Sequence, residues 1–353
     1  MPRTRRNVLQ MTALALGGSG LTSLAGCLGG TAGTDETATD GPTTAPSTDD
    51  GSDESGESFR EWLIDPTNTP LRDGYGIVYH DVAAIRERRD AIHENAYERL
   101  KSEMLREAPA RNLLDTEDVS ATLSLDFEAK IAFGSFDPDA FGERLAEKWN
   151  ARATSTDEPT TPTRTPRPEP EEYRGFRLFG DRRVYAVSED IVLLVSTMGR
   201  RDGDSLERAR AILDARLDGE TRYPDGNEYV GAMLGLVEET HALTCYPEAM
   251  DGSSSRGFRK DVITGGLKSW RFGPQTTEFT FANTYPDAKA AKNAEFEAYV
   301  ESDRFDPYDG LDVTTDGKMV WTKGTIPTGE FDHLSPGGPG DSVHTANGNL
   351  ARR

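Results

Sequence analysis

Few side chains in the sequence could act as nucleophiles or metal ligands: the chain has two cysteines and five histidines among 353 residues. One thiol, Cys245, lies in the apolar run 242–246, where an unpaired cysteine is most often a small core residue. A nucleophilic role would need a base and an orienting group nearby, which the sequence alone does not place. The histidines are far apart and are expected to be structural or surface residues: His80, His93, His241, His333 and His344.

Three short patterns approach catalytic or binding motifs but lack an essential residue. After His93, the chain has Tyr97 where a zinc-protease helix needs its second histidine. The run 265–269 ends like a phosphate-binding loop, but Leu267 replaces the glycine whose backbone must approach the phosphate. The run 252–256 has an arginine where a nucleophile elbow needs glycine. We therefore predict no catalytic residue, no metal ligand and no cofactor.

Two further groups could contact a ligand. Four carboxylates in the region 306–316 could bind Ca²⁺, which prefers oxygen ligands, but they are not spaced as in known calcium loops. In a chain this acidic, such a run is also expected by chance. Trp270 and Trp321 could line a groove, although aromatic strand residues are first of all core residues. The carboxylates belong to Asp306, Asp309, Asp312 and Asp316.

The first 27 residues carry the clearest signal in the chain. Arg5 and Arg6 precede hydrophobic residues, which is typical of the twin-arginine export route. The stretch 8–26 is interrupted by too many polar residues and glycines for a membrane-spanning helix. Residues 24–27 read Leu-Ala-Gly-Cys and resemble the box at which lipoprotein signals are cut, so that Cys27 would become the lipid-bearing first residue.

Two other interpretations of this segment remain: an ordinary cleaved signal with a chance cysteine, or an uncleaved anchor. The lipoprotein is favoured because Cys27 lies where the apolar run ends and a long polar segment begins. One lipid chain binds a membrane only marginally, and lipoproteins of this type usually carry two or more. We expect lipid attachment at Cys27 and a location on the outer side of the cell membrane.

The charge of the chain excludes some classes of partner. It has 61 acidic and 40 basic residues and a net charge of −21. Nucleic acids and anionic lipid headgroups bind through Lys and Arg, so we expect neither as a partner. An acidic surface indicates affinity for cations or adaptation to a salty medium in which charges are screened. We interpret it as a solubility device.

The composition also divides the chain into segments. The polar spacer before residue 59 has too few apolar residues to order itself. A Pro- and Thr-rich stretch inside the body is either a linker or a disordered loop, and we favour the loop because the segment before it is too short to form its own core. The predicted segments are the signal peptide 1–26, a disordered tether 27–58, a first lobe 59–218 with the disordered loop 154–172, a second lobe 219–331 and a disordered tail 332–353.

Within the body the hydrophobic period switches repeatedly between that of a strand and that of a helix. This predicts an α+β fold of antiparallel sheets backed by helices. We expect single helices at 81–108 and 286–301, and two further helices that bury Trp149 and Leu217. Strands are predicted at 76–80, 130–136, 173–179, 183–187, 191–196, 241–246, 262–272, 276–281, 311–314 and 319–322.

The two halves of the body share a short pattern. Residues 133–140 align without gaps on residues 281–288, and each segment runs from a strand through Pro-Asp-Ala into a helix. One interpretation is a duplicated βαββ unit that forms two similar lobes with a ligand cleft between them. The alternative is that any strand-to-helix turn favours Pro-Asp-Ala.

A resemblance to a protein group covers most of the body. The turn 134–140 and the strands 173–179 and 186–192, together with the signal and the acidic composition, resemble haloarchaeal twin-arginine-exported lipoproteins of unknown function. These motifs belong to strands and turns, so the resemblance implies a fold and no mechanism. The leading hypothesis is a membrane-anchored, non-enzymatic binding or envelope-interaction protein for an unknown small molecule or protein. The alternatives are a solute-binding component of a transporter and an envelope enzyme, and the sequence predicts no oligomeric state.

Overall fold

A computed structural model describes the folded body, whose residues all lie in one compact unit. The predicted tether and tail, Arg5, Arg6, Cys27 and the central part of the loop 154–172 lie outside the described residues. The described ranges are 59–110, 112–126, 128–154, 169–180, 182–196, 204–247 and 263–331.

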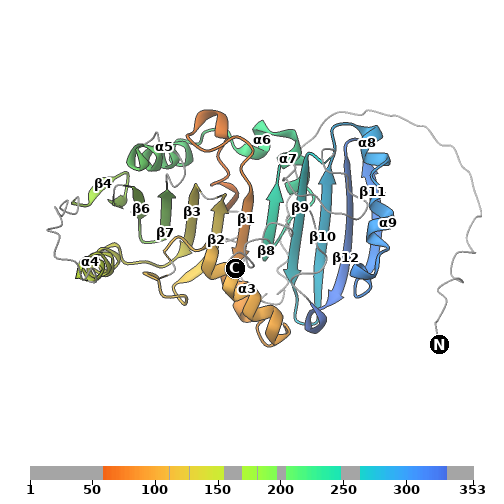
Figure 1. The fold of residues 1–353 in the computed structure, drawn as a ribbon, viewed down its shortest axis with the longest axis horizontal. Coiled ribbons are helices and arrows are strands. Elements are labelled where there is room, and N and C mark those ends of the chain that lie inside the picture. Colours follow the sequence, from red (N-terminus) through yellow and green to blue (C-terminus); the bar gives the residue numbers. More distant parts are fainter. Residues whose placement is uncertain are drawn as a thin grey trace, which may run out of the picture. The chain divides into compact units, whose positions relative to one another are not determined.

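The described residues form a 12-stranded sheet in which neighbouring strands are antiparallel, with helices on both faces (Figure 1). This confirms the predicted α+β class. The sheet order is β11-β12-β10-β9-β8-β1-β2-β3-β7-β6-β5-β4. The strands are β1 (Ile77–Asp81), β2 (Val119–Leu125), β3 (Ala129–Gly134), β4 (Glu171–Tyr173), β5 (Phe176–Phe179), β6 (Arg183–Val187), β7 (Ile191–Ser196), β8 (Ala242–Tyr246), β9 (Gly265–Phe272), β10 (Thr276–Thr284), β11 (Asp309–Asp316) and β12 (Met319–Pro327).

Two hydrophobic clusters lie on opposite faces of this sheet, because successive side chains of a strand alternate between faces. One face is covered by α5, α6, α7 and residues 59–75, and the other by α2, α3, α4, α8 and α9. The helices are α2 (Val82–Glu87), α3 (Glu94–Glu107), α4 (Pro138–Thr154), α5 (Ser205–Leu217), α6 (Tyr223–Gly226), α7 (Glu228–Leu234), α8 (Ala288–Lys292) and α9 (Phe296–Val300), with short 3-10 turns η1 (Pro66–Asn68), η2 (Asp303–Phe305) and η3 (Thr328–Glu330).

The two halves of the body meet at the antiparallel pair β1–β8, where Ile77 lies opposite Cys245 and His80 opposite Ala242. Outward from this seam, the first half runs β1-β2-β3-β7-β6 and the second runs β8-β9-β10-β12-β11. In each half, the third strand leads through one or more helices to later strands that return beside it. The halves therefore repeat one strand order within a continuous sheet.

The gapless alignment of residues 133–140 on 281–288 nevertheless does not match structurally equivalent residues of the two halves. Phe133 packs on the face covered by α5 and α7, whereas Phe281 packs on the opposite face. The helix starts disagree as well, because Asp137 accepts hydrogen bonds from the first backbone N–H groups of α4, and Asp287 does so for α8. The capping carboxylates are thus the equivalent residues, whereas the alignment matched Asp287 with Asp139.

Three predicted elements are interrupted in the structure. The helix expected at 81–108 is two helices, because the ring Nδ1 of His93 accepts the Asn95 N–H and starts α3 anew. The strand expected at 173–179 is the hairpin β4–β5, whose turn residues Arg174 and Gly175 both have positive φ. The helix expected at 286–301 is broken before α9, where Glu295 is left-handed.

Two predicted burial sites and one strand also differ from expectation. Trp149 and Leu217 are each 43% exposed instead of buried. Strand β2 was not predicted, although residues 119–125 alternate between apolar and polar types as a strand does. It pairs with both β1 and β3 and supplies part of the surface on which α2 and α3 pack.

Candidate functional site

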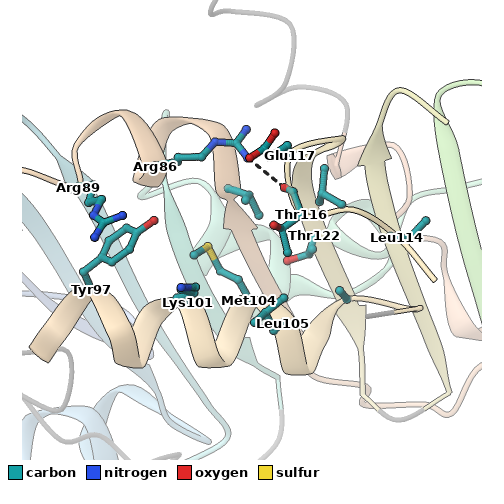
Figure 2. Close-up of a pocket in the computed structure, with 13 residues that line it drawn as sticks. Arg86, Arg89, Tyr97, Lys101, Met104, Leu105, Leu114, Thr116, Glu117 and Thr122 are labelled. Carbon is teal, nitrogen blue, oxygen red and sulfur yellow. Dashed lines mark hydrogen bonds between the residues drawn. The ribbon is translucent and has the colours of Figure 1, made fainter. Parts of the chain in front are cut away.

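A cavity of about 260 Å³ lies between α2, α3, strand β2 and the segment that joins α3 to β2 (Figure 2). Helical spacing explains how two stripes of side chains reach it. On α2 and the turn after it, Val82, Arg86 and Arg89 follow one another at intervals of four and three residues. Such residues share one face of a helix. On α3, Tyr97, Lys101, Met104, Leu105 and Ala108 do the same.

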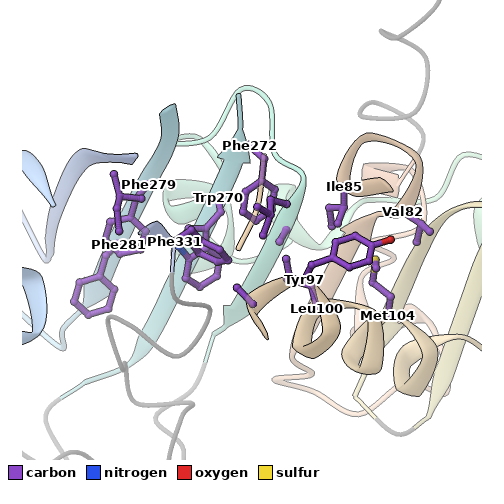
Figure 3. Packing of buried hydrophobic residues seen from close by; sticks show 14 of the residues in the cluster. Val82, Ile85, Tyr97, Leu100, Met104, Trp270, Phe272, Phe279, Phe281 and Phe331 are labelled. Atoms are coloured by element: carbon purple, nitrogen blue, oxygen red, sulfur yellow. The ribbon is translucent and has the colours of Figure 1, made fainter. Parts of the chain in front are cut away.

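The floor of this cavity is apolar. Val82, Met104 and Val119 belong to the hydrophobic cluster on this face of the sheet, and Leu114 packs against it. Figure 3 shows the same cluster extending from α3 to the aromatic side chains of β9 and β10. The floor is thus formed by side chains of the hydrophobic cluster on this face of the sheet.

The rim of the cavity is basic. Arg86 donates from Nη1 to the backbone oxygen of Thr116 at 2.9 Å. The guanidinium of Arg89 lies 5.2 Å from the centre of the Tyr97 ring, within the range of a cation–π contact (Figure 2). Lys101 completes the set of cations. Glu117 is the one carboxylate among the described residues that line the cavity, and Lys101 also pairs with Glu98 of α3 at 3.7 Å.

A buried hydroxyl also belongs to the lining. Thr122 is 1% exposed, and its Oγ1 has no hydrogen-bond partner among the described residues. It lies on β2 between His80 of β1 and Ala132 of β3. An unpaired buried hydroxyl costs about 1–3 kcal/mol of stability. A ligand oxygen that accepted this hydrogen bond would recover part of that cost.

A second hollow of about 250 Å³ lies where α3 begins. It is lined by His93, Asn95 and Arg99 from one side and by the turn η3 from the other. Its histidine caps α3 through Nδ1, so that ring nitrogen is already occupied. The cavity beside β2 is the better candidate site, since it combines an apolar floor, a basic rim and an unpaired hydroxyl.

Cys245 is fully buried in β8, as a small core residue would be. Burial raises the pKa of its thiol to about 12, so the thiolate nucleophile is not populated near neutral pH. His241 is also buried, and burial lowers its pKa. Its Nδ1 accepts the Phe272 N–H at 3.0 Å, which is a structural bond.

The remaining candidates from the sequence do not converge. Trp270 packs in the cluster beneath α3, whereas Trp321 packs against the cluster on the other face. The run 265–269 lies in strand β9 and forms no loop. Within the ranges that the structure describes, the acids of 306–316 form no group that could hold a metal ion. His333 and His344 lie outside those ranges.

From the sequence alone, none of the cavity residues is assigned to a site. The available signal was the spacing of Arg86 and Arg89 behind Val82, which places two cations on an apolar helical stripe. Their approach to Thr122 depends on β2, which was not predicted. None of the helices in the described ranges combines the length and the apolar character needed to cross a membrane.

No family model and no curated protein matches this chain. Among solved structures, it is similar to crystal form III of TP0453, with a TM-score of 0.41 and 10% identity over 76% of this chain and 94% of the other. Crystal form I of TP0453 gives a TM-score of 0.41 and 11% identity, covering 80% of this chain and 98% of the other. These similarities are distant.

Proposed function

We propose that this protein is a non-enzymatic binding protein on the outer side of the cell membrane, with its ligand site in the cavity between α2, α3 and β2. The observation that carries the proposal is the lining of that cavity, which combines three cations with apolar side chains of the core. A concave apolar surface with a few convergent polar groups is the usual form of a small-molecule site.

Binding is the function that this lining chemistry supports. Apolar side chains stabilise a ligand by removing its surface from water, at roughly 25 cal/mol per Å². Arg86 and Arg89 are oriented by contacts to Thr116 and Tyr97, so less conformational entropy is lost when they meet a ligand.

Attachment to the membrane is the second part of the proposal. Export would use Arg5 and Arg6, and lipid on Cys27 would anchor the chain. A polar chain of about thirty residues has a root-mean-square reach on the order of 30 Å. The body would then bind its ligand close to the membrane without inserting a helix into it.

A ligand-library thermal-shift screen in molar salt tests the binding site. Met104→Trp fills the cavity, and Met319→Trp is the matched control because it makes the same change on β12, against the opposite face of the sheet. Compounds that bind in the cavity should raise the melting temperature of the wild type and of Met319→Trp, but not of Met104→Trp. Compounds that stabilise all three equally would place the site elsewhere, and a screen without hits would remove the support for binding.

Incorporation of radiolabelled lipid tests the anchor. The wild type should take up label and partition with membranes, and Cys27→Ser should do neither. Label that persists in Cys27→Ser would show that the lipid is attached to another residue. A wild-type chain without label would contradict the anchor while leaving the cavity proposal intact.

A further inference from the structure

We infer that the ligand of this cavity is a small anionic amphiphile: one short apolar chain or ring that carries a carboxylate or phosphate group. The inference rests on the proposed function and adds the chemical class of the ligand. It follows from three features of the lining, namely its apolar floor, its basic rim and the buried hydroxyl of Thr122.

The floor determines the size and adaptability of the apolar part. A volume of about 260 Å³ has room for a small ligand and not for a two-chain lipid. Met104 and Leu105 line it together, and the flexible thioether of methionine adapts to ligands of different shape. Each methylene buried there should tighten binding about fourfold until the cavity is full.

The rim determines the charge of the ligand. Three cations and one carboxylate line the cavity, in a chain whose net charge is −21. The predicted exclusion of nucleic acids and anionic lipid headgroups rested on the charge of the whole chain, whereas this recess is locally basic. A guanidinium has five N–H donors, so the bond from Arg86 to Thr116 leaves others for a ligand. Carboxylate and phosphate oxygens are the acceptors that match this fork.

The hydroxyl of Thr122 adds a directional contact. Thr122 is one of the lining residues, and its buried Oγ1 has no hydrogen-bond partner among the described residues. Because the side chain is 1% exposed, bulk water is a poor substitute for a partner. An oxygen of the bound amphiphile can accept the hydroxyl proton, and a ligand with no acceptor leaves the group unpaired.

Calorimetric titration of the full chain carrying Cys27→Ser tests the ligand class, because removal of the lipid site avoids detergent. The probes are octanoate, octyl phosphate, 1-octanol and acetate. Both anionic amphiphiles should bind, octanol should bind about tenfold more weakly, and acetate should not bind. The ratio of the octanoate and octyl phosphate affinities then decides between a carboxylate and a phosphate head group.

Two substitutions assign the contacts. Arg89→Gln should weaken octanoate binding about tenfold with little effect on octanol, whereas Arg99→Gln, an exposed residue of α3 outside this cavity, should change neither. Thr122→Val keeps the shape of the side chain and should weaken both anionic probes. Should Thr122→Val fail to fold, the Arg89→Gln result still decides the charge contact.

The outcomes separate this inference from the proposed function. Octanol that binds as tightly as octanoate, no binding of either anionic amphiphile, or an Arg89→Gln variant with unchanged affinity would overturn the anionic class. If library compounds bind the wild type but not Met104→Trp, the cavity would remain the binding site even then. Compounds that bind unchanged to Met104→Trp would overturn both proposals.

Discussion

Arg208 should be among the most costly charged residues to replace. Its Nη2 donates to the backbone oxygen of Pro70 at 2.8 Å and to Oε2 of Glu128 at 3.0 Å. The same carboxylate oxygen accepts the Arg72 N–H at 2.8 Å. Arg208 is 6% exposed, so α5, the β2–β3 turn and the segment before β1 meet at a buried charge cluster.

The expected loss of unfolding free energy in Arg208→Met follows from the contacts that the variant keeps. Methionine keeps most of the aliphatic stem, so the change removes the charge and its hydrogen bonds more than the packing. Removing one partner of a buried ion pair typically costs about 3–5 kcal/mol. Because Glu128 keeps the Arg72 N–H and some contact with solvent, the lower end of about 3 kcal/mol applies.

Urea unfolding provides the measurement, and Arg174→Met provides the matched control. Arg174 pairs with Asp214 and Asp218 at 2.8 and 2.6 Å, but the side chains of all three are at least one third exposed. That substitution should lower the free energy of unfolding far less than Arg208→Met does, and molar salt should abolish the effect. Adding Glu128→Gln to Arg208→Met should recover part of the loss, since a neutral amide is cheaper to bury.

Two results would refute this reasoning. Arg208→Met could cost no more than Arg174→Met, which would mean that the buried cluster contributes no more than an exposed pair. Alternatively, Glu128→Gln could leave the loss in Arg208→Met unchanged, and the unpaired carboxylate would then not be its cause.

Burial raises the pKa of Cys245 to about 12, so the folded protein keeps a proton that the unfolded chain loses above about pH 8.5. The contribution of Cys245 to the free energy of unfolding should be fully present below that pH and should be lost as the pH rises towards 12. Urea titrations at several pH values should therefore show a smaller loss of stability with pH for Cys245→Ala than for the wild type. Equal losses in the two proteins would contradict this. Asp287→Ala removes the cap of α8 and should cost about 1 kcal/mol by thermal unfolding, whereas no change would show that the cap is dispensable. A Cβ on Gly134 would lie 1.9 Å from the Asp118 backbone oxygen, whereas a Cβ on Gly175 would meet open space at a φ of +89°. Gly134→Ala should therefore lower the free energy of unfolding in urea more than Gly175→Ala does. The reverse order would exclude the clash.

The sequence predicts the strands of this fold better than its helix breaks. Short apolar segments such as 183–187 and 191–196 are strands as predicted, because turn residues bound them on either side. The breaks before α3 and α9 depend on a ring nitrogen of His93 and a left-handed Glu295, which leave no periodic trace. Strand β2 was missed although its sequence alternates, and the structure buries its polar residues Thr122 and Ser124 as well as its apolar ones.

The candidate site could not be predicted for a related reason. Its residues come from α2, α3, β2 and the segment between α3 and β2, and only tertiary packing brings Arg86, Met104 and Thr122 around one space. Helical spacing indicates which residues share a face, but not whether the covering helix leaves part of the core open. The Gly134 turn, by contrast, was visible in sequence, and its structural reason is the close approach of Asp118.

The seam between β1 and β8 also has a consequence for the order of folding. It joins Ile77 to Cys245, so its hydrogen bonds close a loop that contains more than half of the body. Pairs such as β6–β7 and β9–β10 close short loops and gain their contacts at little entropic cost. We expect each half to collapse first and the seam to form after the main barrier, so that substitutions at Tyr79 and Leu243 accelerate unfolding more than they slow folding.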